Sequence, residues 1–261
     1  MNARARPLGQ VGSLQDSVNP QEWSARVELA AAYRIAARLR WTDHISTHFS
    51  SRVPGPEEHF LINAFGLTFD EITASNLVKV DLGGEIQHDA TGLGINRAGF
   101  VIHSALHGGR ANVGCVLHTH TAAGIGVSAQ ANGLLMISQH AMHFFNRLSY
   151  HDYEGVATDL DEQGRLVQDL GGNDAMVLRN HGLLTCGPSV AHAFTELNLL
   201  ERACQAQVAA QAAQAPLIVG PDAVAQKVAD IACSARWPSL IELYWGAFVR
   251  EQDRVDPSYA S

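Results

Sequence analysis

The sequence predicts an α/β fold in which a mixed, mainly antiparallel sheet is flanked by helices. Short apolar runs bounded by turn residues alternate with stretches of helical periodicity. The pattern includes a hairpin, which an all-parallel sheet would not contain. At 261 residues the chain is long enough to bury a large core.

The first half of the chain is expected to contain two helices and several short strands. Residues 20–40 carry apolar side chains at helical spacing, and Pro20 stands near the start, where proline is favoured. The Gly83-Gly84 pair is typical of a hairpin turn between two strands. A second helix is predicted over 98–109, directly before an apolar strand that ends at His118 and His120. The other short strands are predicted over 44–52, 60–64, 77–81 and 85–87.

The second half is expected to be mainly helical around one further strand. That strand covers 175–182 and ends in His181. The stretch 134–152 shows no clear period, so it is left unassigned. A long alanine-rich helix over 189–214 has an apolar face suited to packing on a sheet or a neighbouring subunit. Shorter helices are predicted over 159–170, from Asp222 onward and over 240–250.

Composition limits the class of protein. We expect a flexible leader over 1–20 and a single domain over 21–261. The net charge of −8 argues against a nucleic-acid partner, and no apolar run reaches the roughly 18 residues that a membrane span needs. The four cysteines stand singly in apolar surroundings without CxxC spacing, which favours buried thiols in a reducing cytoplasm.

Three histidines at the ends of the two apolar strands predict a metal site. His118 and His120 are two residues apart, so on a strand both imidazoles lie on one face. His181 closes the second strand and supplies a third imidazole. His103 and His107 have helical i, i+4 spacing but lack the glutamate of the zinc-protease helix, so we interpret them as a polar helix face near the cleft.

Four motifs in series resemble the class II aldolase/adducin family, in its adducin-head-like bacterial subgroup. The resemblance covers residues 22–212, in order and with sensible spacing. The motifs are Asn96-Arg97-Ala98-Gly99-Phe100, Leu117-His118-Thr119-His120-Thr121, His151-Asp152-Tyr153-Glu154-Gly155 and Leu178-Arg179-Asn180-His181-Gly182. This resemblance implies a three-layer α/β/α fold, tetramers with active sites near subunit interfaces, and a zinc ion bound by His118, His120 and His181.

The sequence departs from the sugar-phosphate aldolases of that family at the substrate site. Those enzymes carry a catalytic glutamate in a Ser-Ser-Glu motif, nineteen residues before the first ligand histidine, and here that position is Gly99. Arg97 replaces one of the serines, while other phosphate-contacting positions correspond to His44 and Phe65, with Gly66 retained. A bulky apolar Phe65 is a poor neighbour for a dianion, whereas a guanidinium binds a carboxylate well. Phe65, Gly66, Arg97 and Gly99 are therefore expected to line a site for a carboxylated or aromatic small molecule.

These departures favour a metal-dependent lyase that works by decarboxylation or C–C cleavage rather than by sugar-phosphate aldol cleavage. Aldol cleavage needs a base to take a hydroxyl proton, and loss of CO₂ does not. The acid–base candidates are His44, His140 and Tyr150. Zinc suits three imidazoles best, with iron, manganese, cobalt and nickel as alternatives. Two other functions stay open: an iron-dependent oxygenase acting on an aromatic hydroxy acid, as in some relatives, and a non-catalytic adducin-like binding module.

Overall fold

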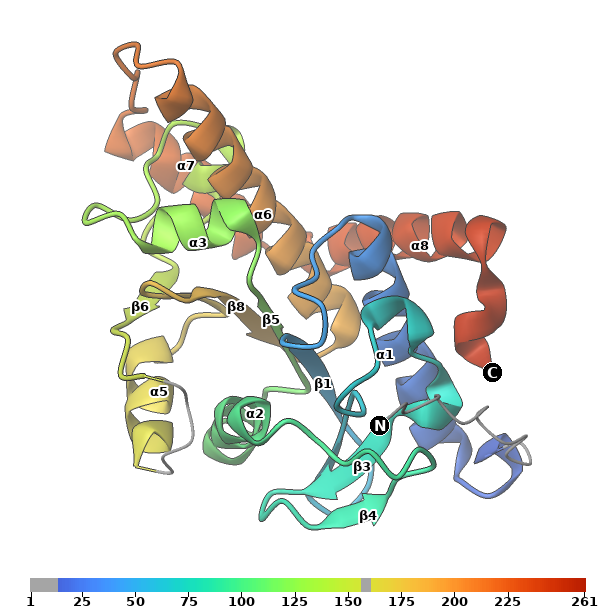
Figure 1. The fold of residues 1–261 in the computed structure, drawn as a ribbon. Helices are drawn as coiled ribbons and strands as arrows, with labels where there is room; N and C mark the ends of the chain where they lie inside the picture. Colours follow the sequence, from blue (N-terminus) through green and yellow to red (C-terminus); the bar gives the residue numbers. More distant parts are fainter. Residues whose placement is uncertain (1–13, 156–160) are drawn as a thin grey trace, which may run out of the picture.

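A single eight-stranded sheet organises the chain, with helices on both faces (Figure 1). The computed structural model describes residues 14–155 and 161–261. Most of the expected leader, residues 1–13, lies outside the described residues. Within them, Leu14–Asp16 forms a 3-10 turn with Leu14 buried, and the first α-helix begins at Pro20. No helix in the described ranges combines the length and the apolar character needed to cross a membrane.

The strand order is β4-β3-β2-β1-β5-β8-β7-β6, and the pairs are antiparallel except β6 with β7, which is parallel. The predicted mixed, mainly antiparallel sheet is thus confirmed. In chain order the strands are β1 (His48–Arg52), β2 (His59–Ile62), β3 (Val78–Asp81), β4 (Ile86–His88), β5 (Cys115–Thr119), β6 (Leu148–His151), β7 (Ala175–Leu178) and β8 (Gly182–Gly187). Between β3 and β4 the predicted hairpin turn is present, with Gly84 at a φ of +88°.

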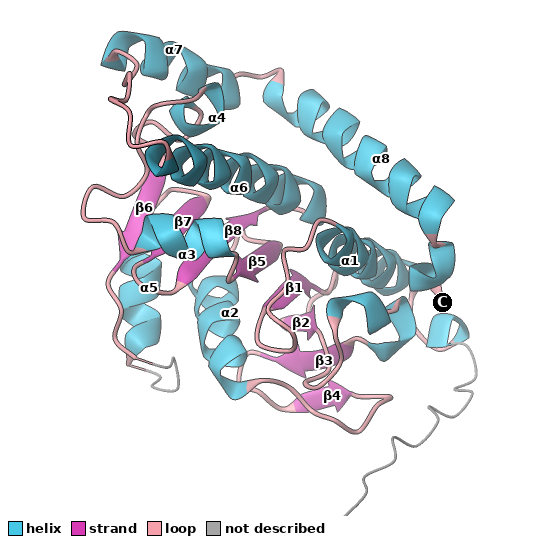
Figure 2. Cartoon of the chain, turned by 45° about the horizontal axis from the view of Figure 1, so that its top comes forward, coloured by secondary structure: helices cyan, strands magenta, loops and turns pink. Residues whose placement is uncertain are grey.

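Helices cover the two faces of the sheet in two separate layers (Figure 2). They are α1 (Pro20–Arg38), α2 (Arg97–Gly109), α3 (Ala122–Ser128), α4 (Gln139–Met142), α5 (Glu162–Leu170), α6 (Val190–Ala212), α7 (Asp222–Ala232) and α8 (Trp237–Val255). On one face α2 and α5 pack over Val116 and Met176. On the other, α1 and α6 pack over the alternating neighbours Leu117 and Val177. The three-layer α/β/α prediction is confirmed.

Two local predictions were wrong, and one helix was not predicted. Residues 175–182 do not form one strand, because the chain turns back after β7 and continues as β8. A short helix, α3, follows His120 directly; its N-cap Thr121 accepts the backbone N–H of Gly124, a capping signal that the sequence analysis missed. The last helix begins at Trp237 rather than at residue 240, with proline at the second helical position, and continues to Val255. The unassigned stretch 134–152 contains α4 and β6.

Candidate metal centre

Alternation along β5 sends its side chains to two different layers. His118 shares a face with Val116, which packs in the α2 layer, whereas Thr119 points to α6 on the opposite face. In the sheet, His118 lies opposite His48 of β1 and Leu184 of β8. The first candidate ligand is thus fixed by the register of a central strand.

Hydrogen bonds at the far nitrogen orient the rings of His118 and His120. The Nδ1 of His118 donates to the carbonyl of Leu183 at 2.9 Å, and the Nδ1 of His120 lies 3.0 Å from a carboxylate oxygen of Asp43. This is the outer arrangement that metal-binding histidines use to fix their tautomer. As a result the two Nε2 atoms face each other at 2.8 Å.

His181 joins them from the turn between β7 and β8. Asn180 adopts a left-handed conformation with φ of 54°, and the backbone N–H of His181 donates to the carbonyl of Leu178. The next residue is Gly182, where a Cβ would lie 2.2 Å from the carbonyl oxygen of Thr119. Only glycine allows β8 to begin this close to the end of β5, and that approach brings His181 to the pair.

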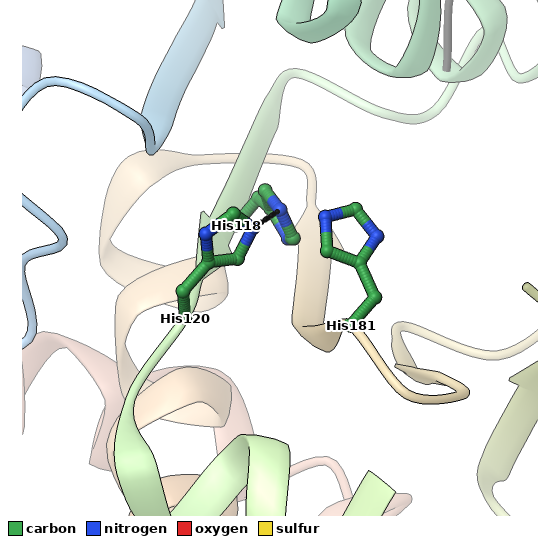
Figure 3. A group of neighbouring side chains, drawn as sticks. All are labelled: His118, His120 and His181. Carbon is green, nitrogen blue, oxygen red and sulfur yellow. Dashed lines mark hydrogen bonds between the residues drawn. The ribbon is translucent and has the colours of Figure 1, made fainter. Parts of the chain in front are cut away.

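The three imidazoles converge on one point (Figure 3). Their ring centroids are 4.6–4.7 Å apart, and one ring nitrogen of each lies within 4.8 Å of the others. Both Nδ1 atoms are engaged elsewhere, so the Nε2 atoms of His118 and His120, 2.8 Å apart, are the ones turned towards the centre of the trio. Three imidazole nitrogens turned to one point are a ligand set typical of zinc, so these residues fit a divalent metal ion.

Burial keeps two rings of this cluster, His118 and His181, neutral. It lowers the pKa of His118 well below its ordinary value, and the neighbouring His181 and His120 lower it further. Burial, followed by the charges of His120 and His151, lowers the pKa of His181 to about 4. Neutral imidazoles are the form that binds metals, so both rings are ready to do so near neutral pH.

A buried carboxylate anchors the ligand strand from behind. Thr119 and Thr121 alternate with the two histidines, and their hydroxyls donate to Glu201 of α6 at 2.8–3.0 Å. Glu201 is fully buried. The Thr-His-Thr segment is therefore held on one side by α6 while its imidazole points to the other side.

The sequence analysis missed His48, which lies beside the trio. Its ring is 5.2 Å from that of His118, centroid to centroid, and only 3% of its surface is exposed. It also touches Gly99, where a Cβ would lie 2.4–2.8 Å from three atoms of the His48 ring. The His48 ring thus occupies the space that a side chain at position 99 would need. The period-two row His48, Ser50, Arg52 was a signal for a polar strand face, but only the β1–β5 register shows that it meets His118.

A buried chain of polar side chains continues from His48 along the α2 layer. His48 Nδ1 lies 2.8 Å from Nε2 of His103. The other ring nitrogen of His103, Nδ1, is hydrogen-bonded to Ser50 Oγ at 2.5 Å. Ser50 in turn lies 2.8 Å from His107 Nε2. His103 and His107 are fully enclosed, so they form an internal network rather than a polar face lining the cleft, and the earlier interpretation is corrected. Burial, then His120 and His181, lowers the pKa of His48 to about 3, so this ring is also neutral.

The expected substrate residues lie around the start of α2 and the loop after β2. Arg97 is exposed in the first turn of α2, two residues before Gly99. Phe65 is 41% exposed, and Gly66 has a φ of +112°. His44 follows Asp43, the partner of His120, and lines a groove of about 530 Å³ between α1, the 3-10 turn at 69–71 and the end of α8.

His140 and Tyr150 have other partners within the chain. His140 lines a separate cavity of about 160 Å³ together with His143 and Trp237. The hydroxyl of Tyr150 accepts the backbone N–H of Leu134 at 3.0 Å, and the guanidinium of Arg179 lies 4.2 Å from the centre of its ring. None of these contacts involves the histidine trio, so the single chain does not bring these two expected residues to it.

Comparisons with known proteins agree with the fold. The family model described as Class II Aldolase and Adducin N-terminal domain matches residues 27–208. A Pseudomonas aeruginosa protein assigned by its name to the class 2 aldolases is 49% identical over 249 residues, covering 94% of this chain and 95% of its own. The structure of an aldolase II superfamily protein from Pseudomonas syringae is similar with a TM-score of 0.92 and 58% identity, over 96% of this chain and all of that one. An L-fuculose 1-phosphate aldolase from Glaciozyma antarctica matches with a TM-score of 0.80 and 26% identity, over 97% and 96% of the two chains.

Proposed function

This chain belongs to the class II aldolase and adducin family, and from that premise we propose that it is a divalent-metal-dependent lyase. Its substrate is a small carbonyl or carboxylate compound, aromatic or aliphatic, without a phosphate group. The reaction is decarboxylation or another C–C cleavage. The observation that supports this most directly is the convergence of three imidazoles, two of which face each other through their Nε2 atoms at 2.8 Å.

His118, His120 and His181 are the residues that would hold the ion, and zinc is the metal we propose. Bound with open coordination positions, a divalent ion supplies a Lewis acid that stabilises negative charge developing on a carbonyl oxygen. The similarity to an L-fuculose 1-phosphate aldolase over nearly the whole chain supports C–C bond chemistry.

The predicted substrate residues would determine which substrate fits. Arg97 is exposed near Gly99 and suits a carboxylate through its two parallel N–H donors. Phe65 offers an exposed aromatic surface instead of a phosphate-binding hydroxyl. Among the acid–base candidates we favour His44, which follows Asp43 in the loop that reaches His120. We propose that His140 and Tyr150 act only if a neighbouring subunit presents them.

We further propose a cytoplasmic homotetramer. Three of the four cysteines are buried free thiols, as a reducing compartment permits, although Cys233 is exposed, contrary to the expectation that all would be buried. On α8, Leu243 and Tyr244 expose 69% and 44% of their surfaces, which suits a subunit contact. Light scattering coupled to size exclusion tests the assembly, and a monomer at micromolar concentration would contradict it.

Metal analysis of anaerobically purified protein tests the lyase proposal. We expect about one divalent ion per chain in the wild type and a sharp loss in His118→Ala, because one of three ligands is removed. His59→Ala is the matched control, since it removes a histidine that pairs with Glu57 instead. Equal metal content in wild type and His118→Ala would refute the site.

Product assays on the loaded protein distinguish the reactions. Small keto and hydroxy carboxylates are incubated with the protein while CO₂, aldehyde and oxygen are followed. Release of CO₂ or aldehyde without oxygen uptake supports the lyase. Bound iron with oxygen uptake on aromatic hydroxy acids would support an oxygenase instead, and an absence of bound metal would favour a non-catalytic module.

A further inference from the structure

The hydrogen-bonded chain behind His48 has a direction, because it ends on a group that can only accept. Nδ1 of His107 lies 3.4 Å from the carbonyl oxygen of Val113, so that nitrogen carries the proton. Its Nε2 is then an acceptor, and the hydroxyl of Ser50 donates a hydrogen bond to it. Ser50 Oγ in turn accepts from Nδ1 of His103.

The last link of the chain determines the tautomer of His48. With its Nδ1 protonated, His103 has a bare Nε2, which accepts from Nδ1–H of His48 at 2.8 Å. Nε2 of His48 is therefore left without a proton. In the described part of the chain it has no hydrogen-bonding partner, and it is not one of the buried side-chain atoms that lack a partner, so a small part of this nitrogen stays accessible although His48 is only 3% exposed.

That lone pair lies where the side chain of residue 99 would otherwise be. An ideal Cβ on Gly99 comes within 2.6 Å of His48 Nε2, and the same imidazole is in ring contact with His118. The site thus holds a hydrogen-bond acceptor next to its candidate metal ligands. This acceptor belongs to His48 on β1 and not to residue 99 on α2. Three positioning residues, His103, Ser50 and His107, keep that acceptor in one orientation.

We propose that His48 is the specificity-determining residue of this site, and that its Nε2 selects substrates carrying a hydroxyl group next to the carbonyl or carboxylate. The proposal rests on the lyase function proposed above. A hydroxyl is the donor that a bare imidazole nitrogen recognises, and a substrate lacking it would leave this buried acceptor unpaired. The substrate class is accordingly a small hydroxy carbonyl or hydroxy acid.

Binding of two matched probes to the cobalt-loaded protein tests the selection. Glycolate and acetate differ by one hydroxyl, and their affinities are measured from the visible spectrum of Co²⁺. In His48→Ala and in His48→Phe, which keeps the ring volume, we expect the glycolate-to-acetate affinity ratio to fall by about twofold to tenfold, the contribution of one hydrogen bond. Cobalt stoichiometry should not change. An unchanged ratio in both variants would overturn the proposal.

The positioning residues have a matched control in the neighbouring serine. Ser50→Ala removes the link that orients His103, so the ratio should fall here too, although His48 itself is intact. Ser51→Ala removes a buried serine from the opposite face of β1 and should leave the ratio unchanged. Equal effects of the two substitutions would refute the directed chain.

A metal-free measurement separates this proposal from the lyase function. In protein dialysed against EDTA, Gly99→Ala should lower the Tm when His48 is present and have little effect in the His48→Ala background, because the ring has left the volume. In the cobalt-loaded protein, the double variant His48→Ala/Gly99→Glu should regain the glycolate preference through its carboxylate. If Gly99→Ala lowers the Tm equally with His48 present and in the His48→Ala background, the claim that the His48 ring occupies the volume of a side chain at position 99 is overturned. Failure of the wild type to bind cobalt would overturn the lyase function and the selection that rests on it, whereas the claim about the volume at position 99, measured by the Tm, would stand.

Discussion

Replacing Glu201 by glutamine is expected to stabilise the folded chain at neutral pH. Glu201 lies behind the histidine strand with none of its surface exposed. Burial raises the pKa of this carboxyl to about 6, and the hydroxyls of Thr121 and Thr119 only partly oppose the shift. Glutamine keeps an oxygen that accepts from these threonines but has no charge to bury.

The size of the effect follows from the protonation of the two states. Below about pH 4.5 the Glu201 carboxyl is protonated in both the folded and the unfolded chain. As the pH rises from 4.5 to about 6, the unfolded chain loses its proton first, so the free energy of unfolding decreases. Above pH 6 the loss is constant at about 2 kcal/mol for a pKa raised to this extent.

Urea unfolding of wild type and Glu201→Gln between pH 4.5 and 8 measures this difference. The variant should match the wild type at pH 4.5 and exceed it by up to about 2 kcal/mol at pH 7. Glu58→Gln removes the same charge from an exposed position and controls for net charge. If the stability curves of wild type and Glu201→Gln run parallel across this range, the assigned pKa shift is refuted.

Three further substitutions probe the site and its support. Asp43→Ala removes the partner of His120 and should weaken zinc affinity about 10–100-fold, as measured by competition with a chromogenic chelator; unchanged affinity would contradict the orienting role. Gly182→Ala forces a Cβ to 2.2 Å from a backbone carbonyl and should cost about 1–3 kcal/mol in urea unfolding, whereas Gly164→Ala, with open space around it, should be neutral or stabilising. Tyr33→Phe leaves buried backbone groups that contact its hydroxyl unpaired, so we expect a loss of about 1–3 kcal/mol, and a loss below 0.5 kcal/mol would argue against that network.

The layered sheet could be predicted because its signals are local. Turn residues such as Gly83-Gly84 and the periodic helix at 20–38 depend on neighbours in sequence. The reversal between β7 and β8 was missed because its turn-forming residues, Asn180 and Gly182, stand in a run that is apolar on both sides. The position of α8 was imprecise because a proline after Trp237 starts the helix earlier than its apolar residues suggest.

The site was predictable where its residues share a strand or a motif. His118 and His120 follow from a two-residue spacing, and His181 from its place at the end of the second apolar run. His48 could not be found in this way, because its role depends on which residue of β1 lies opposite His118. A one-residue shift of that register would turn His48 to the α6 face. The role of Gly99 likewise could not be predicted, because it depends on the His48 ring that occupies the space of its missing side chain.

The two pieces of chain that carry the histidines are already hydrogen-bonded neighbours, since β5 pairs with β8 from Cys115–Gly187 to Thr119–Leu183. The entropy of bringing distant segments together is therefore offset by the sheet itself and not by the ion. In this molecule the fold would form without the metal, unlike that of a zinc finger, which is unfolded when its ion is removed. Chelation should empty the site and leave the circular dichroism spectrum unchanged. The fold therefore does not depend on which ion the three histidines hold.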